Sequence, residues 1–174
     1  TLSGGTFTAP STSMTVSGNF AHSAGTFTHN SGTVTLDGTS QTISGSTTFN
    51  NFTKSVAAAA TLTFTAGTTQ TIAGTLTLQG ASGQLLSLRS SVNGTQWNID
   101  PQGTRAVSYL DVKDSQNINA TAIETTASVN SGGNIGWFAI SLSGTAYSDA
   151  GFTPLASKTV AISLNGAAAA ATTT

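Results

Sequence analysis

Apolar residues return at a fixed spacing of 24 positions through residues 61–112 of this 174-residue chain. Two such series occur, two positions apart: Leu62, Leu86 and Leu110, and then Phe64, Leu88 and Val112. Alternation of apolar and polar residues is typical of half-buried strands, and a repeat of this length is typical of proteins built from stacked units. The spacing therefore predicts parallel strands stacked one above another, with each series forming a column of inward side chains.

Each predicted coil has two main strands. The first strands hold Val34 and Leu36, Leu62 and Phe64, Leu86 and Leu88, and Leu110 and Val112. The second strands follow about half a coil later, around Phe49, Leu76, Ile99 and Ile123, and the coils become shorter along the chain. Phe7, Val16, Phe20 and Phe27 are assigned to earlier coils. The pattern indicates an all-β fold, a right-handed parallel β-helix of about five coils.

Short sequence echoes support this interpretation. Gly-Thr-Phe-Thr occurs at Gly5–Thr8 and at Gly25–Thr28, and Gly38–Gly45 matches Gly67–Gly74 at six of eight positions. In a Thr-Φ-Thr strand, where Φ is apolar, one face is apolar and the other carries β-branched hydroxyl residues. Glycine before each strand is typical of a tight corner.

Composition excludes several classes of function. Only 6% of the residues are charged, against roughly a quarter in an average soluble domain, and the net charge of −1 gives no basic footprint for nucleic acid. No cysteine is present, so disulfides, thiol nucleophiles and cysteine metal sites are all excluded. The sequence has no apolar run long enough to span a membrane. This composition is typical of a protein of the cell exterior.

Residues 1–138 resemble the repetitive parallel β-helix regions of large bacterial surface and secreted, adhesin-like proteins. The resemblance depends on the runs Gly32–Phe52 and Gly103–Ser115 and on the closing motif Asn134-Ile-Gly-Trp. Residues 139–174, with Ser143–Asp149 and Thr153-Pro-Leu, resemble the first strands of an immunoglobulin-like or carboxypeptidase-regulatory-like β-sandwich. The resemblance implies a β-helix over 1–138 followed by a partial sandwich or strand-exchange segment over 139–174, and it implies no catalytic residue.

Few residues suggest chemistry. A glycan-cleaving site would need carboxylates that share one groove, and the candidates are Asp100, Asp111, Asp114 and Glu124. Alternation places Asp111 outward beside Lys113, which favours an exposed ion-pair cluster. A calcium site of Asp111, Asp114 and Asn117 fits by ligand type, but the glycine-punctuated acidic repeat of calcium-binding β-rolls is missing. His22 and His29 have no third metal ligand apart from Asp37. No enzyme activity and no cofactor is expected.

Threonine pairs suggest a second class of function. An ice-binding face would use hydroxyl groups two residues apart on stacked strands, and the candidate residues are Thr26, Thr28, Thr33, Thr35, Thr61, Thr63, Thr75 and Thr77. The alignment places Thr63 above Ser87 and Asp111, so the array ends at the charged coils. The competing interpretation is that threonine is the ordinary outward residue of a strand.

The favoured prediction is an extracellular structural or scaffold protein of a cell surface or filament, with ice binding and then polysaccharide binding or cleavage as alternatives. Its expected partners are further copies of itself or neighbouring domains of a larger chain, with a glycan also considered. A hypothesis for assembly is that Thr159–Leu164 adds a strand to a neighbouring chain through Val160, Ile162 and Leu164. Three glycosylation sequons, at Asn51, Asn93 and Asn119, are a weak motif on their own.

Overall fold

The computed structural model describes residues 1–138, 159–164 and 167–172. The chain divides into two compact units, Thr1–Ala139 and Ile140–Thr174, each described by itself below. Within the described residues there are strands and turns but no helix, and so no helix that could cross a membrane. The prediction of an all-β chain with parallel strands is therefore confirmed.

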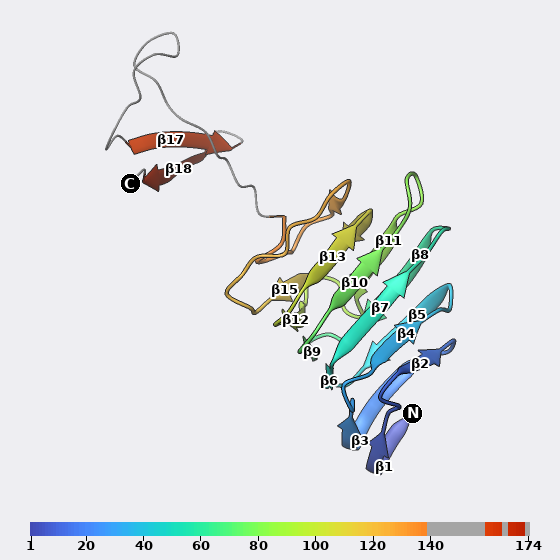
Figure 1. Ribbon diagram of the computed structural model, residues 1–174. Coiled ribbons are helices and arrows are strands. Elements are labelled where there is room, and N and C mark those ends of the chain that lie inside the picture. The colour runs from blue at the N-terminus through green and yellow to red at the C-terminus, as the bar shows by residue number, and fades with distance from the viewer. Residues whose placement is uncertain (139–158, 165–166, 173–174) are drawn as a thin grey trace. The chain divides into compact units, whose positions relative to one another are not determined.

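Three parallel sheets make up the first unit, and the strands of each sheet lie in chain order (Figure 1). The seven-stranded sheet contains β1 (Leu2–Thr8), β3 (Phe20–Thr28), β5 (Ser40–Ser44), β8 (Ala60–Phe64), β11 (Leu86–Ser90), β14 (Leu110–Val112) and β16 (Val129–Asn130). The five-stranded sheet contains β2 (Ser13–Val16), β4 (Thr33–Leu36), β7 (Asn51–Ser55), β10 (Leu76–Gln79) and β13 (Arg105–Ser108). The four-stranded sheet contains β6 (Thr47–Phe49), β9 (Thr69–Ile72), β12 (Trp97–Pro101) and β15 (Ser115–Asn117).

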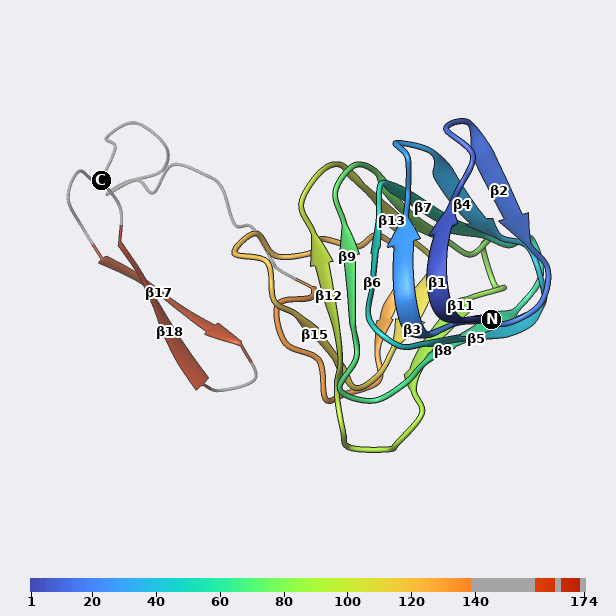
Figure 2. The same ribbon diagram turned by 90° about the horizontal axis from the view of Figure 1, so that it is seen from below.

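From β5 to β15 the chain visits the three sheets in a repeating order: seven-stranded, four-stranded, then five-stranded. One such passage is a circuit. Figure 2 shows the strands of the three sheets arranged around a shared interior. This arrangement is compatible with a β-solenoid; the hand and the number of coils stay predictions.

Side chains alternate between the interior and the outer face along the strands from β4 to β15, whereas most residues of β1, β3 and β16 are exposed or half-buried. In β8, Ala60, Leu62 and Phe64 are buried, whereas the two threonines between them are half-buried. The same alternation on the other strands fills one continuous core, which runs from Phe20 to Trp137. Burial of each leucine of this core stabilises the fold by about 1.5–3 kcal/mol. The threonine-rich sequence thus builds strands whose stability comes from the apolar residues between the threonines.

The prediction that the apolar series point inward and share one sheet is confirmed. The predicted spacing of 24 residues between stacked positions is right for the step from β11 to β14 but wrong for the step from β8 to β11. Leu62, Leu86 and Leu110 share the seven-stranded sheet and are fully buried. Leu86 pairs with Leu110, as predicted, whereas Leu62 pairs with Leu88. The step from β8 to β11 is therefore two positions longer than predicted, because a hairpin closed by an Ala81–Gln84 bridge lengthens the preceding connection. As a result Thr61, and not Thr63, lies opposite Ser87.

The prediction of two strands in each coil is also wrong, because a circuit has three. Phe49 and Ile99 lie on strands of the four-stranded sheet, whereas Leu76 lies in the five-stranded sheet, opposite Phe52. Val34 of β4 belongs to that five-stranded column and not to the column of Leu62. The two matching octapeptides form β5 and β9, which are in different sheets.

The far end of the first unit is closed as the sequence predicts. Trp137 is 8% exposed, forms a parallel bridge with Ile123 and packs edge-on against Trp97 at 6.4 Å. Phe138 packs against the same core. These aromatic rings cover apolar side chains that the last circuit would otherwise expose to water.

In the second unit, β17 (Thr159–Leu164) and β18 (Ala167–Thr172) form an antiparallel pair. Val160, Ile162 and Leu164 lie opposite Ala171, Ala169 and Ala167. The strand over 159–164 is therefore confirmed, and it has a partner, β18, within its own chain. The predicted strand and turn around Ser143–Asp149 lies outside the described residues.

Candidate functional site

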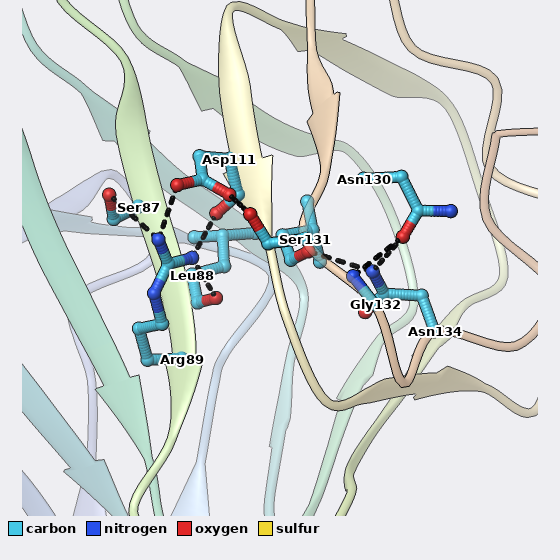
Figure 3. Close-up of polar contacts among 9 residues, drawn as sticks. Ser87, Leu88, Arg89, Asp111, Asn130, Ser131, Gly132 and Asn134 are labelled. Carbon is cyan, nitrogen blue, oxygen red and sulfur yellow. Dashed lines mark hydrogen bonds and ion pairs between the residues drawn. The ribbon is translucent and has the colours of Figure 1, made fainter. Parts of the chain in front are cut away.

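Arg89 and Asp111 form an ion pair on the outer face of the seven-stranded sheet (Figure 3). Arg89 Nη2 donates to Asp111 Oδ2, and Nη1 donates to the backbone oxygen of Asp111 at 2.6 Å. The other carboxylate oxygen, Oδ1, accepts a hydrogen bond of 2.6 Å from Ser131 Oγ. Both oxygens of Asp111 thus bond to neighbouring segments, in a half-buried ion pair and not in the exposed cluster that the sequence predicts. The partner is Arg89, however, and not Lys113.

Strand β16 and the segment after it continue this network. Asn130 Oδ1 accepts hydrogen bonds from the backbone nitrogen of Gly132 at 3.0 Å and from Asn134 Nδ2 at 2.7 Å (Figure 3). Asn134 Nδ2 also donates to the backbone oxygen of Val112 at 2.7 Å, and Asn134 Oδ1 accepts from the backbone nitrogen of Ser115. The polar side chains here hold one segment against the previous circuit.

Replacing Asp111 with asparagine is expected to lower the free energy of unfolding by no more than about 1 kcal/mol, because a single ion pair that solvent still reaches contributes little. The side chains of Arg89 and Asp111 are 29% and 21% exposed. Urea denaturation at low and at high salt measures the effect, and the difference from the parent chain should shrink in high salt. Asp100→Asn is the matched control, since Asp100 is also a half-buried outward acid. A loss above about 3 kcal/mol would contradict a surface pair.

The remaining acids do not gather into one groove. Asp114 is buried and its Oδ2 accepts from the backbone nitrogen of Gly94 at 2.9 Å, while Asp100 accepts from Gln102 and Asn119. Glu124 is exposed. Among the residues the structure describes, no three His, Cys, Asp or Glu side chains lie close enough to hold a metal ion.

The three residues considered for calcium have separate partners. Asp111 is paired with Arg89, Asp114 bonds to Gly94, and Asn117 Nδ2 donates to the backbone oxygens of Thr121 and Gly136. Asn117 presents an amide N–H rather than an oxygen toward these groups, so it stabilises the turn. A common cation site is not formed by this arrangement.

The two histidines and the three sequons are also engaged locally. His22 bonds to Thr47 Oγ1 at 3.0 Å and to the backbone oxygen of Gly25, and His29 Nδ1 accepts from the backbone nitrogen of Ser31. The sequon asparagines also have partners: Asn51 bonds to Thr75 and Thr33, Asn119 to Arg105, Asp100 and Thr121, and Asn93 to Lys113. Asn93 is exposed, whereas the other two are half-buried.

Lys54 is a buried cation that the sequence interpretation missed. Its exposed fraction is 0%, and its Nζ donates to Gln41 Oε1 at 2.7 Å and to the backbone oxygen of Gly38. Gln41 Nε2 in turn donates to the backbone oxygen of Val16 at 2.8 Å. Burial lowers the pKa of Lys54, and the negative charge of Asp37 opposes that shift. The signal was present in the sequence, because Lys54 follows the inward Phe52 by two positions.

The lowered pKa of Lys54 predicts a pH dependence of stability. Between the folded-state pKa and 10.5, the value of an ordinary lysine, the unfolded chain binds a proton that the folded chain does not. The free energy of unfolding should therefore rise with pH across this window. In Lys54→Met this rise should be absent, so the parent chain should gain stability relative to the variant as pH increases across the window. Denaturation at pH 7 to 11 measures it, with Lys113→Met as the control, and parallel curves for parent and Lys54→Met would contradict it.

The threonine candidates separate into two groups. Thr33 and Thr35 of β4 lie in the five-stranded sheet, as does Thr77 of β10, and Thr75 directly precedes β10. Thr26, Thr28, Thr61 and Thr63 lie on β3 and β8 of the seven-stranded sheet. The eight residues therefore do not form one face.

The five-stranded sheet nevertheless carries an ordered threonine column that includes two residues outside the predicted set. Thr15, Thr35, Thr53 and Thr77 lie opposite one another in successive strands β2, β4, β7 and β10. Ser13, Thr33 and Asn51 form a second column beside it. Thr15 is exposed and the other three threonines of the first column are half-buried. The column ends at β13, where Ala106 is opposite Thr77.

The geometry thus offers two kinds of surface: a polar network that ties circuits together, and a regular threonine column. Comparison of the chain with family models, with curated proteins and with solved structures finds no match.

Proposed function

We propose that residues 1–138 form a right-handed parallel β-helix that acts as a rigid spacer in an extracellular structural protein of a cell surface or filament. One observation carries this proposal: side-chain amides of buried or half-buried residues bond one circuit to the next. Gln41 donates to the backbone oxygens of Val16 and Gly18, and Gln70 donates to that of Gly45 at 2.8 Å. These bonds add to three backbone ladders, so every circuit is attached to its neighbour at its strands and at its corners.

The same pattern continues through the first unit. Asn51 Oδ1 accepts from the backbone nitrogen of Thr75 at 2.8 Å, and Asn117 Nδ2 donates to the backbone oxygen of Gly136. Each of these partners lies 19 to 24 residues away along the chain, which is one circuit. The right-handed course is supported by the general preference of parallel strand connections. Because these side-chain amides are engaged in bonds between circuits, they support a structural role.

Single-molecule pulling of the full chain between its termini tests the spacer. Unfolding of the first unit should occur as a discrete rupture that releases up to about 45–50 nm of chain, at roughly 3.3–3.6 Å for each residue. Continuous extension at low force, without a rupture, would refute a load-bearing role. Antibody labelling of intact cells that make the protein tests the extracellular location, and labelling only after the cells are opened would refute it.

Assembly through the second unit is a further part of this proposal. A two-stranded sheet is marginally stable in water by itself, and within the described residues β17 and β18 pair only with each other. A strand from a neighbouring chain, added at the edge of β17 beside Val160, Ile162 and Leu164, would supply the missing packing. Deleting residues 139–174 should then abolish filaments seen by electron microscopy. Filaments that survive the deletion would refute this role.

Ice binding is the second candidate, because the threonine column gives it a specific surface. Neighbouring strands place Thr15, Thr35, Thr53 and Thr77 about 4.8 Å apart, in one line. If this line contacts ice, Thr35→Tyr should abolish thermal hysteresis, whereas Thr63→Tyr on the other sheet should leave it unchanged. The absence of thermal hysteresis in the parent chain would exclude ice binding.

A further inference from the structure

An exposed turn follows β11 and carries Asn93 and Gly94 at its centre. The backbone nitrogen of Thr95 donates to the backbone oxygen of Val92 at 3.1 Å, which closes the turn, and residues 91–95 are all exposed. Gly94 has a φ of +78°, and a Cβ there would have nothing within 4 Å. Water therefore reaches both central residues of the turn.

An asparagine followed by glycine can react with its own backbone, because the next backbone nitrogen and the side-chain carbon Cγ close a five-membered ring. Glycine favours this attack, since it has no side chain to crowd the nitrogen. The reaction is slow unless the nitrogen loses its proton and the negative charge that develops on the side-chain oxygen is stabilised. A site that promotes the reaction therefore needs an acceptor at the glycine N–H and a donor at the asparagine Oδ1.

The neighbouring circuit supplies both groups. Asp114 Oδ2 accepts a hydrogen bond of 2.9 Å from the backbone nitrogen of Gly94, which is within the range of a general base. Lys113 Nζ donates to Asn93 Oδ1. Both residues directly follow β14, the strand that pairs with β11, and the backbone oxygen of Asp114 also accepts from Trp97 at 3.1 Å. The backbone ladder thus holds a carboxylate and an ammonium group against the turn.

We propose that residues 93–94 form a self-modification site at which Asn93 is converted to aspartate or isoaspartate, with Asp114 as base and Lys113 as electrostatic donor. The Gly94 nitrogen forms a bond to Asn93 Cγ, and its proton passes to Asp114. The bond from Cγ to Nδ2 breaks, and the side-chain nitrogen leaves as ammonia with that proton. Water then adds to either carbonyl of the cyclic imide and opens the ring. In the aspartate product, an ion pair with Lys113 replaces that lysine's bond to a neutral amide.

Incubation of the full chain in mildly alkaline buffer, followed by peptide mass mapping, tests this reaction. Trypsin releases residues 90–105 as one peptide, which should gain the mass difference between an amide and a carboxylate. Fragmentation of this peptide distinguishes Asn93 from Asn98. The incubation lasts until Asn165, the other asparagine that precedes a glycine, is converted in a denatured sample of the chain.

Two variants make the test specific to the promoting groups. Asp114→Asn and Lys113→Met should each slow the conversion of Asn93 by about 10-fold or more, as the loss of a positioned proton acceptor or charge does. Asp100→Asn is the matched control and should leave the rate unchanged, because its carboxylate bonds to other side chains. Thermal unfolding shows which variants are folded. Lys113 is only half-buried, so its variant keeps the test decisive if the buried Asp114 cannot be replaced.

Three results would each overturn the proposal. The first is an Asn93 that remains an amide in the folded chain at the end of the incubation. The second is conversion at the parent rate in Lys113→Met or in a folded Asp114→Asn, which would leave the dipeptide alone responsible. The third is a tryptic product in which residues 90–105 are joined to Lys113, since it forms only when the lysine amine attacks Cγ in place of the Gly94 nitrogen.

Discussion

Leu88→Ala is expected to lower the free energy of unfolding by about 2–5 kcal/mol, the cost of removing a fully buried leucine from a packed core. Leu88 is 0% exposed on β11, between Leu62 of β8 and Val112 of β14. Truncation leaves a cavity that parallel ladders on both sides prevent from closing. Urea denaturation measures the loss, and Ser87→Ala, at the adjacent outward position, should change the free energy by no more than about 0.5 kcal/mol.

The same leucine distinguishes the observed register from the one that the spacing predicts. Leu62 lies directly opposite Leu88, whereas the predicted spacing would place it opposite Leu86. In double-mutant cycles with alanine, the Leu62/Leu88 pair should therefore show the larger coupling, on the order of 0.5–3 kcal/mol. A larger coupling for Leu62 with Leu86 would contradict the register.

Gly45→Ala should lower the free energy of unfolding by about 2–5 kcal/mol, from two separate costs. Gly45 has a φ of +79°, a left-handed conformation that disfavours a side chain. A Cβ at this position would lie 1.7 Å from the backbone oxygen of His22 in the previous circuit, so the two circuits would have to move apart. Denaturation by urea or heat measures the combined effect.

Gly67→Ala is the matched control for Gly45→Ala. Gly67 has nearly the same backbone conformation, with a φ of +73°, but a Cβ there would have nothing within 4 Å. This variant should lose only the conformational part, about 1 kcal/mol. Equal losses at the two positions would show that close stacking of circuits contributes nothing. In the pulling experiment, Gly45→Ala should likewise lower the rupture force more than Gly67→Ala.

The inward residues could be predicted from sequence because alternation along a strand is a local property. Leu62, Leu86 and Leu110 are all buried in one sheet, and Trp137 covers the last circuit. The register between strands could not be predicted to the same accuracy. A slip of two residues keeps every side chain on its own face, so pairing Leu62 with Leu86 or with Leu88 gives the same apolar pattern.

The number of sheets could not be predicted either, because a short motif depends on the local turn and not on its position within a circuit. The octapeptides Gly38–Gly45 and Gly67–Gly74 are nearly identical, and each buries its glutamine and bonds it to the preceding circuit. The first nevertheless forms β5 of the seven-stranded sheet, and the second forms β9 of the four-stranded sheet. An alignment that treats the two octapeptides as equivalent therefore assigns two different positions of the circuit to the same one.

Individual polar sites were predicted unevenly. The outward direction of Asp111 was predictable, but its partner Arg89 was not, because their contact depends on the register of β11 and β14. Lys54 was missed because a lysine is ordinarily assigned to the surface, even where alternation places it inside. Thr53 was missed because it does not belong to a Thr-x-Thr pair, yet it completes the threonine column.

The unequal circuits have a consequence for how such a chain can change. Paired residues are 18 positions apart between β4 and β7, 26 between β8 and β11, and 29 between β10 and β13. The strands stay paired although the connections between them differ in length, so we expect an insertion or deletion at one corner to leave the strands that follow in place. The hairpin at residues 80–85, where Gly83 has open space around it, is a place where foreign peptides could be displayed without remaking the rest of the molecule.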